Sequence, residues 1–108
     1  MKELTRKEEQ IMLAIRRLRQ DAYLITIRDQ IRRFTGTTYS VGTIFAPLHR
    51  LEMNGFVVSY TQTDRRFTSK KPIKFYKLTD TGLQALVELR KAQSLMWRGV
   101  PRTAEERS

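Results

Sequence analysis

The sequence predicts an α+β fold made mainly of helices, because its 108 residues show two kinds of periodicity in a fixed order. Three segments between residues 6 and 54 repeat apolar side chains every three to four positions, which is the period of an amphipathic helix. Residues 56–63 and 73–78 are instead rich in β-branched and aromatic side chains, as strands are. A further helical segment follows at residues 81–97. The expected order is therefore three helices, a two-stranded hairpin and a long last helix, all in one domain.

The first two helices are predicted from the residues at their starts. Thr5 and Glu8 have the spacing of a capping box, in which each side chain satisfies a backbone donor of the other, so the first helix is expected over residues 6–20. A second capping box is expected at Thr26–Asp29, and the second helix is expected to end before Gly36. Its side chains that point toward the core are Ile27, Ile31 and Phe34.

The third helix is expected to start at Ser40 and to end at Gly55. Its apolar side comprises Val41, Ile44, Leu48 and Leu51. Residues 64–72 are charged and rich in turn-forming residues, so they are expected to form the tip of the hairpin. Thr79 or Asp80 is expected to cap the last helix.

These elements divide the chain into three parts. Residues 1–79 hold the three helices and the hairpin, which together make a winged helix-turn-helix domain. Residues 80–98 are expected to form a long C-terminal dimerisation helix. Residues 99–108 are polar and contain a proline, so a disordered tail is expected there.

The charge of the chain indicates the class of its partner. The chain has 21 lysines and arginines against 11 acidic residues, which gives a formal net charge of +10. A protein this basic is expected to meet a polyanion, because neutralising phosphates releases condensed counterions. For a winged helix-turn-helix domain, that polyanion is expected to be double-stranded DNA.

The residue counts argue against several other classes of protein. The chain has no cysteine, so it has neither a disulfide framework nor a thiolate metal site, and His49 is its only histidine. No nucleophile–base pair, glycine-rich phosphate loop or carboxylate cluster indicates an enzyme, a cofactor or a metal. No segment approaches the roughly 20 apolar residues that cross a bilayer, and the first ten residues contain no export signal. A cytoplasmic protein with no membrane partner is therefore expected.

The third helix is expected to enter the major groove and to read the DNA sequence. The side that its apolar positions leave free comprises Tyr39, Ser40, Gly42, Thr43, Ala46, His49 and Arg50. Small residues near the helix start allow the backbone to approach bases and phosphates, and Thr43 and Arg50 are the best candidates for hydrogen bonds to DNA. Ser40 is equally explained as an N-cap alone, and His49 as a surface residue rather than a pH switch.

The hairpin and the second helix are expected to contact phosphates. Six basic residues and no acidic one occur between positions 65 and 77. Like charges this dense repel one another, which is tolerable in water and favourable beside phosphates. The expected contacts are Arg65, Arg66, Lys70, Lys71 and Lys74 on the hairpin, with Arg28 and Arg32 on the second helix. The alternative is a basic loop that is merely solvated.

The last helix carries two neighbouring apolar stripes. One consists of Ala85, Leu89, Ala92 and Met96, and the other of Leu83, Leu86 and Val87. Two such stripes can cover the helix's own domain and also meet a second copy of the chain. The residues expected in that dimer contact are Leu89, Ala92, Met96 and Trp97. The alternative is a single wide face against the core.

Two stretches carry more specific motifs. Tyr39–Phe56 contains Ser-Val-Gly-Thr at the start of the third helix and Leu-His-Arg-Leu-Glu near its end, and Lys74–Gly82 ends in Lys-Leu-Thr-Asp-Thr-Gly. With the opening residues 4–18, they resemble the PadR family of bacterial transcriptional regulators. The resemblance covers residues 4–97 and departs from the family pattern at Leu24, where a glycine is expected.

This resemblance implies a dimeric repressor or activator that senses a small molecule, in the compact form with a single dimerising helix. Compact members bind planar drugs against a tryptophan between two such helices, which implies a planar effector beside Trp97, with plain dimer packing as the alternative. The expected function is a repressor that binds a palindromic operator as a homodimer and is released by an effector. A winged-helix module that binds RNA or a protein partner without sensing a ligand is the alternative function.

Overall fold

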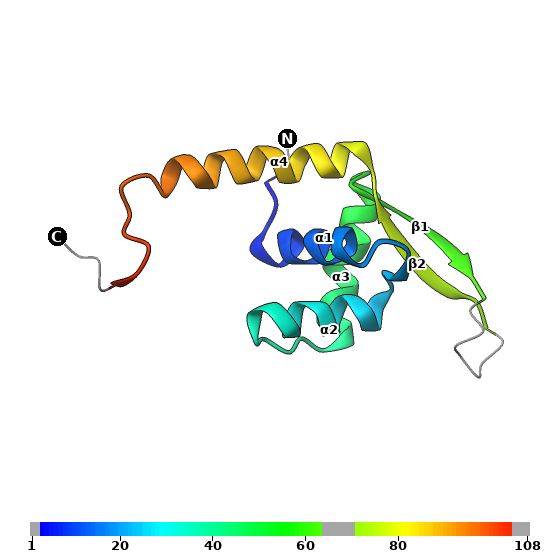
Figure 1. Ribbon diagram of the computed structural model, residues 1–108. Coiled ribbons are helices and arrows are strands. Elements are labelled where there is room, and N and C mark those ends of the chain that lie inside the picture. The colour runs from blue at the N-terminus through cyan, green and yellow to red at the C-terminus, as the bar shows by residue number, and fades with distance from the viewer. Residues whose placement is uncertain (1–2, 64–70, 105–108) are drawn as a thin grey trace.

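The computed structural model describes residues 3–63 and 71–104 of the chain. Its elements are α1 (Arg6–Leu18), the 3-10 turn η1 (Arg19–Asp21), α2 (Leu24–Thr35), α3 (Val41–Met53), β1 (Val57–Gln62), β2 (Ile73–Leu78) and α4 (Asp80–Met96). Three helices pack together, the hairpin projects from one side and α4 crosses above α1 (Figure 1). This order confirms the predicted α+β, mainly helical fold. Among the described residues, no helix is long and apolar enough to span a membrane.

The start of α1 is fixed by the predicted capping box. The backbone nitrogen of Thr5 donates to Oε1 of Glu8 over 2.9 Å, and the nitrogen of Glu8 donates to Oγ1 of Thr5 over 3.1 Å. The Glu8 side chain is only 2% exposed, so its carboxylate is buried against the domain with a partner already in place. Because a buried charge without partners is costly, this cap ties the helix start to the core.

The predicted capping box at Thr26–Asp29 is wrong, because the N-cap of α2 is Tyr23 and the helix begins at Leu24, three residues earlier than a cap at Thr26 implies. Oγ1 of Thr26 accepts a hydrogen bond from the backbone nitrogen of Tyr23 over 2.9 Å and donates to the carbonyl of Asp21 over 2.6 Å. Thr26 therefore reaches back from inside the first turn, where a threonine hydroxyl can bond the preceding backbone as well as cap a helix. Leu24, the departure from the family pattern, is simply the first residue of the helix.

The predicted inward position of Phe34 is also wrong. Ile27 and Ile31 are buried as expected, but Phe34 in the last turn of α2 is 58% exposed. Its ring lies 4.3 Å from the guanidinium carbon of Arg17 on α1, which is a cation–π contact at the surface. Gly36 ends the helix with a φ of 75°, as its position predicts.

The hairpin is antiparallel, and its second strand is hydrogen-bonded to the segment that precedes α2. Its register pairs Val57 with Leu78 and Gln62 with Ile73. The backbone nitrogen of Tyr76 donates to the carbonyl of Ala22 over 2.8 Å, just before α2. The buried hydrophobic side chains converge on the space between this hairpin base and α1, α2 and α3, so the base of the hairpin is part of the core.

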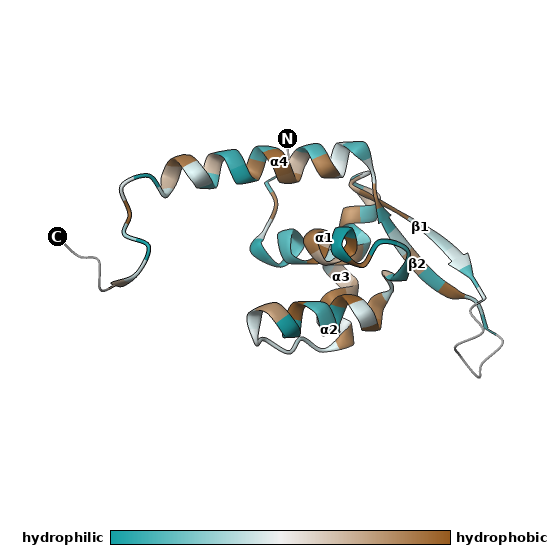
Figure 2. Cartoon of the chain, viewed as in Figure 1, coloured by the Kyte–Doolittle hydropathy of each residue, from teal (hydrophilic) through white to brown (hydrophobic). Residues whose placement is uncertain are grey.

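α4 starts against the core and then leaves it. Thr79 caps the helix through a hydrogen bond from the backbone nitrogen of Gly82 to Oγ1 over 3.0 Å. Gly82 and Leu86 are buried, whereas every residue from Lys91 to Val100 is exposed. The molecule consequently extends 59 Å along its long axis and 21 Å along its short one. Figure 2 shows apolar residues continuing along the part of α4 that lies beyond the body.

Gly82 permits the close approach of α4 to the strand start. A Cβ at this position would lie 2.1 Å from the carbonyl oxygen of Phe56 and 3.3 Å from Cε of Met12. We expect Gly82→Ala to lower the free energy of unfolding by about 2–3 kcal/mol, because the helix must move away from backbone that cannot give way. Urea denaturation of the purified protein measures this change.

The matched control is Gly42→Ala in α3, where an added Cβ meets no atom within 4 Å. This variant should be stabilised by about 0.5–1 kcal/mol, since alanine is a better helix former than glycine. Equal stability of the two variants would show that α4 does not depend on a side-chain-free position.

Candidate nucleic-acid interface

α3 has one buried side and one side open to solvent. The buried residues are Ile44, Pro47, Leu48 and Leu51. The exposed residues opposite them are Gly42, Ala46, His49 and Arg50. These four residues and Ser40 are exposed as expected, whereas Tyr39 and Thr43, also expected on the free side, are half-buried. Val41 was expected to face the core and is 37% exposed, because the first turn of the helix extends past its neighbours.

The start of α3 is held by side chains that were predicted to meet DNA. Oγ of Ser40 accepts from the backbone nitrogen of Thr43 over 3.1 Å and lies 2.7 Å from Oγ1 of the same residue. The hydroxyl of Tyr39 donates to Oε1 of Gln10 on α1 over 3.2 Å, and Nζ of Lys7 lies 5.2 Å from its ring centroid. Ser40 therefore caps α3, and Tyr39 connects the start of α3 to α1. Arg50 is the long side chain of α3 that remains exposed as a hydrogen-bond donor.

Phe45 is a surface residue of α3 that sequence analysis missed. Its side chain is 52% exposed, and its ring stacks on that of His49 with centroids 6.2 Å apart and planes 10° apart. From the sequence, Phe45 was placed neither on the apolar side nor on the free side of this helix. The 100° step between successive helix residues was the signal that could have placed Phe45 outside the apolar side.

Glu52 joins the end of α3 to both strands of the hairpin. Its carboxylate accepts hydrogen bonds from Oγ of Ser59 on β1 and from Nζ of Lys74 on β2, the second over 3.2 Å. The Ser59 hydrogen bond, followed by the contact with Lys74, lowers the pKa of Glu52, and the same contact raises the pKa of Lys74. Lys74, expected to bind phosphate, thus lies in an ion pair that sets the hairpin against the helix.

Lys74 also packs on the hairpin itself. Its Nζ lies 5.6 Å from the ring centroid of Tyr76, whose pKa is raised because burial disfavours the phenolate. The lysine is therefore placed between an anionic group on α3 and an aromatic face on β2. Such a position holds a side chain in one orientation more firmly than either contact alone.

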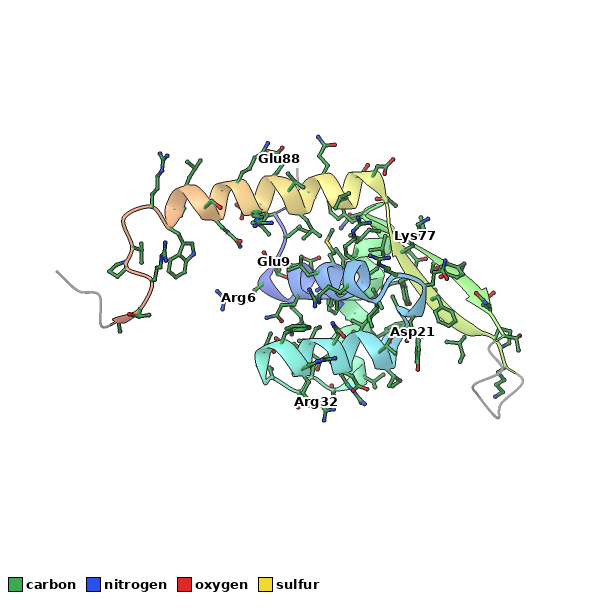
Figure 3. The ribbon with its side chains drawn as sticks, viewed as in Figure 1. Arg6, Glu9, Asp21, Arg32, Lys77 and Glu88 are labelled. Atoms are coloured by element: carbon green, nitrogen blue, oxygen red, sulfur yellow. The ribbon has the colours of Figure 1, made fainter. Side chains whose placement is uncertain are left out.

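The other predicted basic residues lie on α2 and the hairpin. Arg28 pairs with Asp29 over 3.5 Å. Arg32 is exposed on the outer side of α2 and points away from α1 (Figure 3). Lys71 is exposed just before β2. Three further predicted contacts, Arg65, Arg66 and Lys70, lie outside the described residues.

Residues 12–88, more than half of the chain, match the family described as the transcriptional regulator PadR-like family. The chain belongs to this family. The match confirms the resemblance noted in the sequence, and it identifies the protein as a DNA-binding transcriptional regulator. Among curated proteins, none matches the sequence at a significant level.

Solved structures of PadR-like regulators share the fold. A PadR family transcription regulator from Clostridium difficile superposes with a TM-score of 0.74 at 20% identity, over 87% of this chain and 93% of its own. A PadR-like transcription factor from Bacteroides fragilis gives 0.69 at 26% identity, over 86% and 84%. A PadR family regulator from Eggerthella lenta gives 0.65 at 28% identity, over 83% and 76%.

In this PadR-like chain, the exposed end of α4, which carries residues predicted for dimerisation, lies apart from the hairpin, which was predicted to contact DNA. The free end of α4 and the hairpin are on opposite sides of the molecule (Figure 1). Met96 is 81% exposed and Trp97 is 65% exposed, while Leu89 is half-buried against the chain's own domain. The most exposed apolar side chains of the helix therefore lie at its C-terminal end. Leu83 and Val87, expected in a stripe beside Leu86, are exposed as well.

The Glu52 contact predicts a pH dependence for this PadR-like domain. Because the pKa of Glu52 in the folded chain lies below its ordinary value of 4.5, its contribution to stability is present above that value and is lost as the pH falls through the lowered pKa. We expect Ser59→Ala to move the pKa of Glu52 back toward 4.5 and to cost up to about 1 kcal/mol at neutral pH. Carboxyl NMR titration measures the pKa.

Ser94→Ala is the control for this prediction, since Ser94 is an exposed serine on the free half of α4. It should leave the titration of Glu52 unchanged. An identical titration curve in Ser59→Ala and the unaltered protein would show that the hydroxyl does not stabilise the carboxylate.

Proposed function

We propose that this regulator is a repressor that binds a palindromic operator as a homodimer, with residues 1–79 as the DNA-binding domain and 80–98 as the dimerisation helix. The observation that carries the proposal is the open side of α3, where Gly42 and Ala46 present no bulky side chain beside the exposed Arg50. Small residues there let the helix backbone approach base edges, and an arginine forms the commonest specific contact, with guanine. A regulator that acts in this way works in the cytoplasm, where the DNA is.

Affinity and specificity are assigned to different parts of the domain. Arg28 and Arg32 on α2, and the basic residues of the hairpin, supply phosphate contacts that do not depend on sequence. Thr43 and Arg50 read bases, while Tyr39 and Ser40 hold the start of the reading helix and lie close enough to its open side to meet the backbone of the DNA. The net charge of +10 supports the sequence-independent part of this division, because it favours binding to a DNA duplex of any sequence.

The proposal of a dimer rests on the exposed apolar side chains of α4. Leu95, Met96 and Trp97 lie on a helix end that the domain does not cover. Large apolar surface of this kind marks an interaction site, and a twofold contact there would offer two copies of α3 to half-sites about 34 Å apart. A small planar effector would enter the same contact beside Trp97, with Leu89 and Ala92 bordering it.

We expect Arg50→Ala to reduce the ratio of affinities for the chain's own promoter duplex and a random duplex by about tenfold, because a base contact contributes about 1–3 kcal/mol of discrimination. Lys71→Ala should instead weaken both duplexes alike and reduce the salt slope by about one unit. Fluorescence anisotropy over a salt series measures both effects.

A structured RNA serves as the competitor in the same experiment. Tighter binding of the RNA than of either duplex would replace the proposed function by an RNA-binding one. No preference between promoter and random duplex in the unaltered protein would remove sequence-specific regulation.

Met96→Glu should convert the dimer into a monomer, because it places a charge in the contact at a cost of several kcal/mol, on the order of 3 or more. Light scattering measures the mass in solution. Met53→Glu is the matched control, since Met53 is an exposed methionine at the end of α3 and its change should leave the mass unaltered. A dimer that survives Met96→Glu places the interface elsewhere.

A further inference from the structure

Phe45 and His49 form an aromatic pair on the exposed part of α3. Phe45 is half exposed, although its neighbour Ile44 and the residue one turn on, Leu48, are buried. Its ring lies parallel to that of His49, one turn further along the exposed part of the helix. The pair therefore presents an apolar ring to solvent and supports that ring from one side.

Phe45 lies on the side of α3 that also carries the contact with the hairpin. Phe45 precedes Glu52 by seven residues, so the two lie on the same side of the helix. Glu52 is the residue that Ser59 and Lys74 of the hairpin hold. Phe45 also belongs to the N-terminal half of α3, and that half of a recognition helix meets the base edges.

The chemistry of the major groove limits what an apolar ring can contact there. Base edges present hydrogen-bond donors and acceptors, which a phenyl ring cannot satisfy. The apolar group on these edges is the 5-methyl of thymine, and phenylalanine is among the side chains that contact it. Phe45 is flanked by Ala46, whose small side chain leaves room for the edge of the base pair.

We propose that Phe45, held by its stack on His49, forms a contact site for the 5-methyl group of thymine and makes the regulator specific for an A·T pair in each operator half-site. This inference rests on the proposed function, because it needs α3 in the major groove. It adds a base identity that neither the fold nor the family states. Burial of one methyl group corresponds to about a fourfold gain in affinity.

The test begins with duplexes that the unaltered protein selects from a pool of random sequence. Each thymine of the selected sequence is then replaced in turn by deoxyuridine, which removes the methyl group and leaves the base pairing unchanged. We expect one position in each half-site to lose affinity by about fourfold. Phe45→Ala should bind the thymine duplex as weakly as the unaltered protein binds the uracil duplex, and should not distinguish the two.

Phe34→Ala is the matched control, because Phe34 is a phenylalanine of similar exposure on α2. It should keep the full difference between thymine and uracil. Phe45→Leu retains an apolar side chain and should keep part of that difference, which makes the test independent of how well Phe45→Ala folds.

Three results would overturn the inference while leaving sequence-specific binding intact. One is a selected duplex in which no thymine-to-uracil change alters affinity, and another is a Phe45→Ala protein that responds to that change as before. A third is a Phe45→Ala protein of altered solution mass, which would assign the ring to a protein interface. A selection that yields no preferred sequence would instead contradict sequence-specific binding itself, and this contact with it.

Discussion

The backbone around Phe56 is the junction on which the rest of the molecule depends. Its nitrogen donates to the carbonyl of Leu51 at the end of α3 over 3.0 Å, and its carbonyl accepts from the backbone nitrogen of Thr79 over 3.1 Å. Oγ1 of Thr79 also donates to the carbonyl of Gly55 over 2.7 Å. The end of α3, both strands and the start of α4 thus meet within a few residues. Since a buried backbone group needs a partner, none of these elements can shift alone.

That junction connects α3, which is proposed to read the DNA, to α4, which is proposed to form the dimer. α3 enters it from one side and α4 leaves it from the other, and Gly82 lets α4 seat directly on the carbonyl of Phe56. The direction of the exposed end of α4 is consequently set by the same contacts that end α3. Glu52 adds a second connection, from α3 to the middle of the hairpin. The backbone of Phe56 and the carboxylate of Glu52 therefore connect the end of α3 to the hairpin, and the carbonyl of Phe56 connects the hairpin to the start of α4.

Sequence periodicity predicted where the helices lie, but not how far their neighbours cover them. The capping box at Thr5, the cap at Ser40 and the stop at Gly36 are local hydrogen-bonding features, and all three hold in the structure. Phe34 and Val41 were misplaced because they sit at helix ends, where a partner surface stops before the apolar stripe does. The same limit applies to Lys74. Its charge is visible in the sequence, whereas its ion pair with Glu52, 22 residues away in the chain, depends on the tertiary fold.

The open space around Gly42 has a consequence for the evolution of this regulator. Nothing lies within 4 Å of the point where its side chain would begin, and its backbone is ordinary helix. A larger residue can therefore appear at this position without disturbing the core, while it changes the outline that the helix offers to a groove. If α3 reads the operator as proposed, stability and operator choice are separable at this position. A duplicated copy of the gene could then diverge toward new promoters through residue 42 and still inherit an intact fold.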